Sequence, residues 1–356
     1  MPPSIEKPSH ECSGRNSSLS KAERVSANRM DSVRFRLKNS GISDRVASII
    51  SKAQRDTTQI SYGYAWNKWC SWCSERKIDP VPGSIATTTE FLTDLFREGL
   101  QVNTLGIYKA SLSATLPYID GFSIGNHPIM KELFKGFTNL RPQEYKTLQN
   151  WEVDKVLETI ITWGKNESLS LKKLTLKLAM LIALTSASRC SEITYLDIAH
   201  MTKLPEGIRF TLTRHKKNRS SAILPGMLFI PYITENKLLC PCLCLETYIQ
   251  KTEKFRNGPQ GAIFRKTIKP HTPVKPSTIS KWITMVIVES GFTAYKAHST
   301  RGKATSEAKN KGLSTKQVMM AAGWRSNSVF RHHYYHPQFN ANFGRTVLLQ
   351  QNRPGI

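Results

Sequence analysis

The sequence predicts a mainly α protein of the α+β class, with an N-terminal helical bundle and a mostly helical second domain containing a small antiparallel sheet. Apolar residues recur at helical spacing through residues 40–138. Helical patterns resume after residue 150 and flank one alternating, strand-like stretch at 208–213. A chain of 356 residues also suits two domains better than one, because each can bury its own core.

The N-terminal part divides into a polar arm and a helical domain. Residues 1–38 are rich in Ser, Lys, Arg, Glu and Asn and have little apolar periodicity, so we predict a flexible basic arm. A compact all-helical domain is expected over 40–138. Its tryptophans at positions 66, 69 and 72 are predicted to be core residues rather than platforms that stack on nucleic-acid bases.

A linker is predicted over 139–149, because Pro142 biases Arg141 away from helical conformation. A new helix is then expected to begin near Asn150, which is a good N-cap residue. This helix opens a second domain over 150–340.

The second domain is expected to be built around a deeply buried helix at 174–184, which is apolar nearly all round. The predicted strand at 208–213 can pair with a returning segment at 222–225, and a polar turn at 214–219 joins them. The remaining expected elements are helices near 243–254, 278–290, 301–311 and 314–322, followed by a C-terminal tail over 341–356.

The charge of the chain points to a polyanionic partner. Lys and Arg number 51 against 26 Asp and Glu, which leaves a net charge of +25. Such a surplus favours double-stranded DNA as partner, and its spread along the chain favours a broad binding face. Composition alone favours a ribosomal or chromatin protein held by charge over an enzyme.

The seven cysteines form no pattern typical of a secreted protein. Their number is odd and no secretory signal precedes them, so we expect an intracellular, reducing compartment and buried thiols. Cys70 and Cys73 have zinc-like spacing, but they lie on an amphipathic helix with no second pair at hand, and no metal is predicted. No apolar run is long enough to span a membrane. The sequence has no P-loop motif, so no nucleotide cofactor is predicted.

The segment from His298 to Tyr335 is the most informative part of the chain. His298 and Arg301 are three residues apart, Trp324 follows, and two tyrosines end the segment. Spacing of three places His298 and Arg301 on one helical face, where imidazole and guanidinium can meet the same phosphate. Each feature alone has an ordinary structural explanation, but their combination in this order specifically indicates a phosphate-binding site.

A second arginine lies far upstream, in Ser188-Arg189-Cys190-Ser191-Glu192. Metal-free phosphoryl transfer requires fixed positive charge around the phosphate, and an arginine can grip two oxygens at once. Glu192 is expected to share a helical face with Arg189 and to orient its guanidinium. By itself, Arg189 would be interpreted as a surface arginine paired with Glu192.

The order of these motifs resembles the tyrosine recombinases. The motif Ala-His-Ser-Thr-Arg-Gly at 297–302, followed by Gly323-Trp324, most resembles the eukaryotic transposon-encoded members, such as those of the DIRS, Ngaro and crypton elements. The resemblance covers about residues 45–340. It implies a clamp around duplex DNA, with a core-binding (SAM-like) domain over 40–138 and the catalytic domain over 150–340.

The resemblance also assigns roles to individual residues. It implies that Tyr334 attacks the scissile phosphate, with Tyr335 as the alternative, and that the leaving oxygen is protonated by Lys216 or Lys217 in the 214–219 turn. Tyr334 lies ten residues after Trp324, whereas the corresponding separation is nine in better-known members. The longer separation resembles that of the eukaryotic transposon branch. The residues expected to surround the phosphate are Arg189, His298, Arg301 and Trp324, with Glu192 in support.

The resemblance implies a site-specific recombinase or integrase that uses neither metal nor nucleotide, acts in the nucleus and assembles as a homotetramer on paired DNA sites. Strands would exchange through a 3′-phosphotyrosine intermediate and a Holliday junction. The expected context is the integration of a mobile element. Two alternatives stay open. One is a catalytically inactive, domesticated DNA-binding protein of the same fold, and the other is a type IB topoisomerase-like activity.

Overall fold

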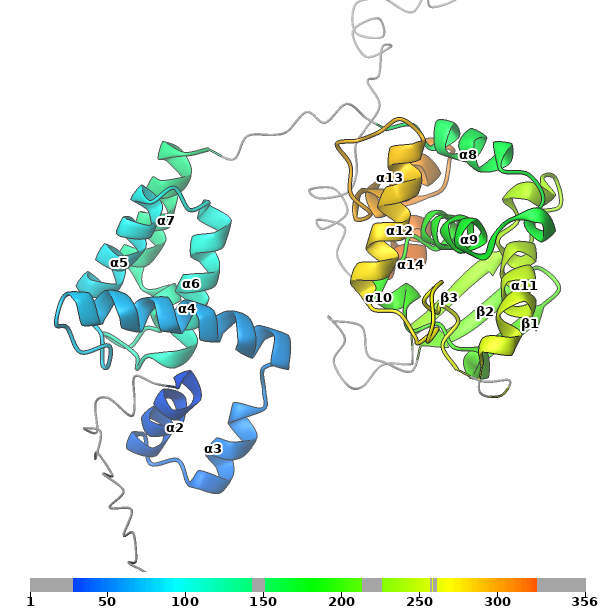
Figure 1. Ribbon diagram of the computed structural model, residues 1–356. Helices are drawn as coiled ribbons and strands as arrows, with labels where there is room; N and C mark the ends of the chain where they lie inside the picture. Colours follow the sequence, from blue (N-terminus) through cyan, green and yellow to red (C-terminus); the bar gives the residue numbers. More distant parts are fainter. Residues whose placement is uncertain (1–27, 143–150, 213–225, 257, 259–260, 325–356) are drawn as a thin grey trace, which may run out of the picture. The chain divides into compact units, whose positions relative to one another are not determined.

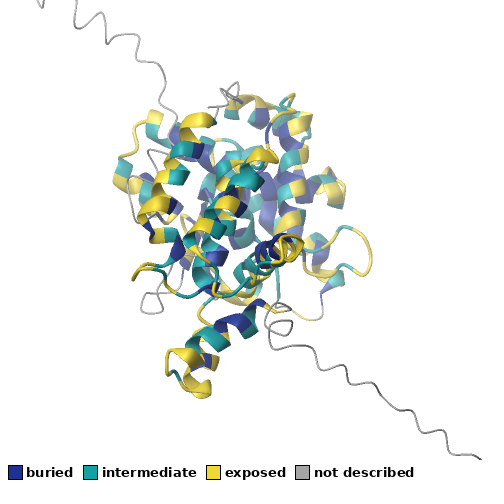
Figure 2. Cartoon of the chain, turned by 90° about the vertical axis from the view of Figure 1, so that its left-hand side faces the viewer, coloured by how far each residue is buried: buried dark blue, intermediate teal, exposed yellow. Residues whose placement is uncertain are grey.

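The computed structural model describes residues 28–142, 151–212, 226–256, 258 and 261–324 (Figure 1). The chain divides into two compact units, Met1–Lys146 and Thr147–Ile356. Each unit has a hydrophobic core of its own, and along the helices buried and exposed residues alternate as amphipathic packing requires (Figure 2).

The first unit is all helical in its described residues, and its core confirms the role predicted for the tryptophans. Trp66 and Trp69 are fully buried and Trp72 nearly so, and Trp69 stacks on Trp72 with ring centroids 5.5 Å apart. Phe91 packs edge-on against both rings. The helices are α2 (Arg29–Asn39), α3 (Asp44–Ser51), α4 (Asp56–Glu75), α5 (Ile85–Arg97), α6 (Val102–Thr115) and α7 (Pro128–Leu140).

The prediction of a flexible arm over 1–38 is wrong for its last ten residues, because α2 occupies that stretch. The Asn28 side chain caps the helix by accepting a hydrogen bond from the Met30 amide. Arg29 is 4% exposed and donates to Thr115 Oγ1 at 3.1 Å and to Gln54 Oε1 at 3.0 Å. Helix α2 packs through the hydrogen bonds of the buried Arg29. The prediction missed this helix because it relied on apolar periodicity, of which α2 has little. Residues 1–27 lie outside the described part of the chain.

The helices on either side of the predicted linker end and begin at other residues than we predicted. Helix α7 continues to Leu140, and Arg141 then adopts φ −136° and ψ 76°, outside the helical region as the following proline requires. The next helix, α8 (Val153–Thr162), is capped by Glu152 and not by Asn150. Trp151 is fully buried in the core and Glu152 is extended, with φ −96° and ψ 126°, so the helix begins only after these two residues.

Helix α9 (Leu171–Ser186) is the centre of the second unit, which confirms the buried helix predicted at 174–184. Every residue from 174 to 183 is buried. Helices α11, α12 and α13 pack against it (Figure 1). The helices of this unit after α9 are α10 (Cys190–Ile193), α11 (Pro241–Thr252), α12 (Pro276–Glu289), α13 (Ser299–Asn310) and α14 (Thr315–Ala322).

A three-stranded antiparallel sheet lies beside these helices, in the order β1 (Met201–Leu204), β2 (Gly207–Leu212) and β3 (Gly226–Pro231). Strand β2 confirms the strand predicted at 208–213 to within one residue. Its pairs Ile208↔Ile230 and Phe210↔Leu228 put apolar side chains on the buried face. Strand β1 was not predicted. The returning segment at 222–225 and the turn at 214–219 lie outside the described residues.

The described cysteines have free thiols, and most of them are buried. Burial raises the pKa of Cys70 to about 11 and those of Cys73, Cys242 and Cys244 to about 12, so these thiols stay protonated at neutral pH. In the described part of the chain, no three His, Cys, Asp or Glu residues are grouped as metal ligands would be. Among the described residues, no helix is both long enough and apolar enough to cross a membrane.

The docking of α2 can be tested by removing its buried cation. We expect Arg29→Ala to lower the free energy of unfolding of the first unit by about 1–3 kcal/mol, because Thr115 and Gln54 lose their partner. Hydrogen exchange of the α4 and α6 amides in urea measures this loss. The matched control is Arg34→Ala on the same helix, since Arg34 is exposed and pairs with Asp31 at 3.0 Å. An equal loss of unfolding free energy in Arg29→Ala and Arg34→Ala would contradict the conclusion that Arg29 docks α2.

Candidate active site

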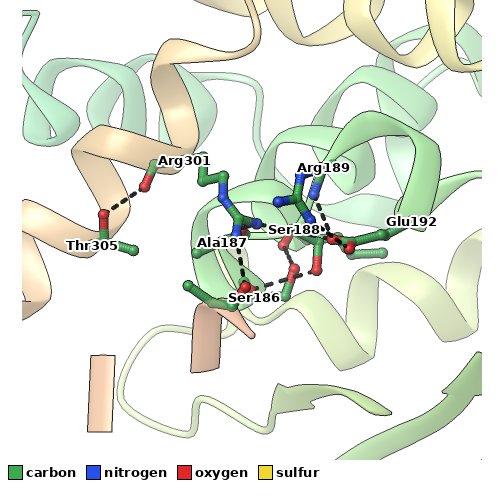
Figure 3. Close-up of polar contacts among 9 residues, drawn as sticks. Ser186, Ala187, Ser188, Arg189, Glu192, Arg301 and Thr305 are labelled. Carbon is green, nitrogen blue, oxygen red and sulfur yellow. Dashed lines mark hydrogen bonds and ion pairs between the residues drawn. The ribbon is translucent and has the colours of Figure 1, made fainter. Parts of the chain in front are cut away.

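Arg301 is the central side chain of the candidate site. It lies in the first turn of α13, is 1% exposed, and points toward the segment from Ala187 to Arg189 (Figure 3). Its Nη1 donates to the carbonyl oxygen of Ala187 at 2.5 Å, and its Nη2 donates to that of Ala322 at 2.7 Å. One guanidinium therefore ties together the ends of α9 and α14, which are far apart in sequence.

The backbone around Arg189 is arranged by the end of α9. Ala187 adopts a left-handed conformation with φ 47°, which ends the helix and turns the chain toward α10. Arg189 then occupies the N-cap position of α10, with Glu192 in the first turn of that helix. The Glu192 carboxylate accepts hydrogen bonds from the Arg189 main-chain N–H at 2.9 Å and from its Nη1 at 3.1 Å. The predicted contact between these two residues is present.

Glu192 also faces the second arginine. Its Oε2 lies 3.9 Å from Arg301 Nη1, so a nearly buried carboxylate stands between two guanidinium groups. The Arg189 side chain is 28% exposed, whereas that of Arg301 is 1% exposed. The cluster carries more positive than negative charge, and Arg189 is its more accessible cation.

His298 directly precedes α13 with helical dihedral angles of −66° and −24°, so it continues the face that carries Arg301. His298 is exposed at the surface, yet desolvation by the surrounding protein lowers the pKa of its imidazole, and the charges of Arg301 and Arg189 lower it further. The ring is therefore neutral at pH 7, with one N–H donor and one acceptor nitrogen.

Trp324 follows α14 and packs beside the arginine cluster. Gly323 ends that helix with φ 65°, a conformation that glycine adopts at little cost. Trp324 is 9% exposed and belongs to a small apolar cluster with Ala187, Val318 and Ala322. The guanidinium carbon of Arg301 lies 4.7 Å from the indole centroid, which is within cation–π range.

The structure thus brings together five of the residues singled out in the sequence, Arg189, Glu192, His298, Arg301 and Trp324. Lys216, Lys217, Tyr334 and Tyr335 lie outside the described residues. The main-chain carbonyls of Ala187 and Ala322 were not anticipated, because any residue type supplies a carbonyl and no side-chain pattern marks it.

Shape does not single out this site. Large surface hollows in the described residues lie elsewhere, with volumes of about 550 and 790 Å³ on either side of α11. The identification of this site depends on its charges and its hydrogen-bond geometry.

Comparison with known proteins identifies the family of this chain. The profile of the Phage integrase family matches residues 146–341, more than half of the chain, and the chain therefore belongs to this family of tyrosine recombinases. An integrase/recombinase xerD homolog of Selenomonas ruminantium is 21% identical over 280 residues, covering 76% of this chain and 80% of that protein.

Two solved structures share the fold. The XerH site-specific recombinase, bound to its palindromic difH substrate in a post-cleavage complex, matches with a TM-score of 0.58 and 12% identity, over 90% of this chain and 93% of that chain. The Tn1549 transposon integrase, in complex with circular intermediate DNA, matches with a TM-score of 0.53 and 10% identity, over 91% and 99%.

The charge cluster makes a prediction about pH. Since the folded-state pKa of His298 lies below its ordinary value, folding disfavours the protonated ring. The associated stability is present above the unfolded pKa of about 6.5 and is lost as pH falls through the lowered folded pKa. We expect the free energy of unfolding to decline over this range and His298→Gln to flatten the decline, as measured by urea unfolding at several pH values.

A direct NMR titration of His298 checks the cause. The midpoint should lie below about 6.5 in the wild type and rise in Arg189→Gln, where one repelling charge is gone. Arg209→Gln, an equal charge change on the exposed face of β2, should leave it unchanged. A wild-type midpoint at or above the ordinary value would refute the assignment.

Proposed function

We propose that this chain is a site-specific DNA recombinase or integrase that cuts and rejoins duplex DNA through a 3′-phosphotyrosine intermediate. The observation that carries the proposal is the buried Arg301, whose hydrogen bonds gather Ala187 and Ala322 so that Arg189, His298 and Trp324 surround one small region. Membership of the Phage integrase family supports the same activity.

In the proposed reaction the Tyr334 phenolic oxygen attacks the scissile phosphorus, and the phenolic proton passes to solvent. The bond to the 5′-oxygen breaks as the 3′-phosphotyrosine bond forms, and Lys217 or Lys216 gives a proton to the departing oxygen. A 5′-hydroxyl of a second strand then attacks the phosphotyrosine and releases the tyrosine. The reaction conserves the phosphodiester bond, so it needs neither metal nor nucleotide.

The different burial of the two arginines supports a division of roles. Arg189 is partly exposed and held by Glu192, so we assign it direct contact with a non-bridging oxygen. Arg301 is almost fully buried, and we assign it stabilisation of negative charge from within the protein, where screening by water is weak. The neutral imidazole of His298 donates one hydrogen bond to the same phosphate.

The wider assignment covers partners and setting. The net charge of +25 favours a broad contact with double-stranded DNA, and XerH and the Tn1549 integrase are relatives in fold that were solved with DNA. We propose that the helices within 28–142 form the core-binding domain, and that a homotetramer assembles on paired sites. Integration of a mobile element of the eukaryotic transposon type, in the nucleus, completes the proposal.

A nicked suicide substrate tests the nucleophile. Wild-type protein incubated with a randomised pool of nicked duplexes should form a covalent adduct, and mass spectrometry of the trapped peptide should place the phosphate on Tyr334. We expect Tyr334→Phe to abolish the adduct and the neighbouring control Tyr335→Phe to retain it, because removing the attacking hydroxyl removes the reaction.

The other outcomes of this experiment are equally informative. Loss of the adduct in Tyr335→Phe alone would move the nucleophile by one residue. No adduct with the wild type would indicate a DNA-binding protein without catalysis. An adduct accompanied by relaxation of supercoiled DNA, but by no junction products, would indicate a topoisomerase.

The general acid can be tested with a modified leaving group. We expect Lys217→Ala to slow cleavage of ordinary DNA by roughly 10²–10⁴-fold, and Lys216→Ala to slow it less. A 5′-bridging sulfur should restore most of the Lys217→Ala rate, because a thiolate departs without a proton at neutral pH. The control Arg189→Ala should stay slow with either leaving group. No recovery in either lysine variant would exclude both as the acid.

A further inference from the structure

Trp151 connects the beginning of the second unit to the turn that carries the candidate site. Its side chain is fully buried, and its indole Nε1 donates a hydrogen bond to Ser299 Oγ at 3.0 Å. The two residues are 148 positions apart in sequence. Ser299 is the first residue of α13, immediately after His298 and two residues before Arg301.

Ser299 is itself held in one orientation. Its hydroxyl donates to the main-chain oxygen of Lys296 at 2.8 Å, so a lone pair of the same oxygen accepts the indole N–H. Ala297, two residues before Ser299, donates its main-chain N–H to Thr284 Oγ1 on α12 at 3.2 Å. The turn before α13 is thus anchored from two directions, by α12 and by Trp151.

This anchoring matters because α13 carries both His298 and Arg301. Misplacement of a catalytic group by about 1 Å can cost about 10²-fold in rate. Main-chain carbonyls hold the far end of the Arg301 side chain, but they leave the start of the helix to other contacts. The hydrogen bond from Trp151 acts at that start.

We infer that Trp151 is a positioning residue for His298 and Arg301, acting through Ser299. The inference deepens the proposed function and rests on it for its catalytic consequence. Trp151 would not touch DNA; it would hold the first turn of α13 at the angle at which imidazole and guanidinium face one phosphate.

The alternative role for Trp151 is simple packing. Its ring belongs to the main core and lies 6.4 Å from the ring of Phe292. Trp151→Phe keeps an aromatic ring in place and removes the N–H, while Ser299→Ala removes the acceptor and leaves the ring untouched. Comparison of these two variants separates the hydrogen bond from the packing.

The second unit offers a matched control. Trp163 donates its indole N–H to Glu289 Oε1, also at 3.0 Å, and Lys173 pairs with the same carboxylate. This bond joins the residue after α8 to the last residue of α12, and neither partner belongs to α13 or to the turn before it. Trp163→Phe is therefore the same chemical change at a place where we expect no effect on the site.

The decisive experiment combines adduct formation with an NMR titration of His298 in the full-length protein. Trp151→Phe and Ser299→Ala should each slow adduct formation roughly tenfold, and the double variant should be no slower than either single one, because both remove one interaction. Each should also move the His298 titration midpoint, whereas Trp163→Phe should change neither quantity.

Wild-type rates in Ser299→Ala, or multiplied losses in the double variant, would overturn the inference. An unchanged His298 midpoint in both single variants would overturn it as well. The titration needs no catalysis, so it still decides whether Trp151 positions His298 in a protein that forms no adduct, and an absence of adduct in the wild type counts against the proposed function instead.

Discussion

The guanidinium of Arg301 is a buried cation, and burying an uncompensated charge costs several kcal/mol or more. Its compensation comes from four groups, namely the carbonyls of Ala187 and Ala322, the carboxylate of Glu192 and the indole face of Trp324. None of these groups is local to α13. The cation is stable only where the ends of α9 and α14 and the start of α10 have closed around it, so folding of the unit and assembly of the site are one event.

The same arrangement determines the electrostatics of the site. One carboxylate faces two guanidiniums, so the cluster retains positive charge after its internal pairing. Desolvation, together with that excess of charge, lowers the pKa of His298, and the excess favours an anion at the partly exposed Arg189. An oxygen of a phosphodiester is such an anion, and the surrounding protein weakens the screening that water would otherwise provide.

Local features of this protein were predictable because they depend on neighbours in sequence. The all-round apolar pattern of α9, the spacing of the tryptophans in α4 and the alternation in β2 each require only a short window. The contact between Arg189 and Glu192 follows from a separation of three residues. By contrast, α2 has almost no apolar periodicity and docks through the hydrogen bonds of Arg29, so it escaped prediction.

The sequence by itself determined which chemical groups this protein can bring to a phosphate, namely two arginines, a histidine, an indole and tyrosines in a characteristic order. Only the tertiary structure decided that Arg301 would be buried and Arg189 partly exposed, and that Trp151 would reach Ser299. The physical reason is that burial and long-range hydrogen bonding depend on main-chain carbonyls and packed rings from distant segments, and these carry no signature in the residue pattern.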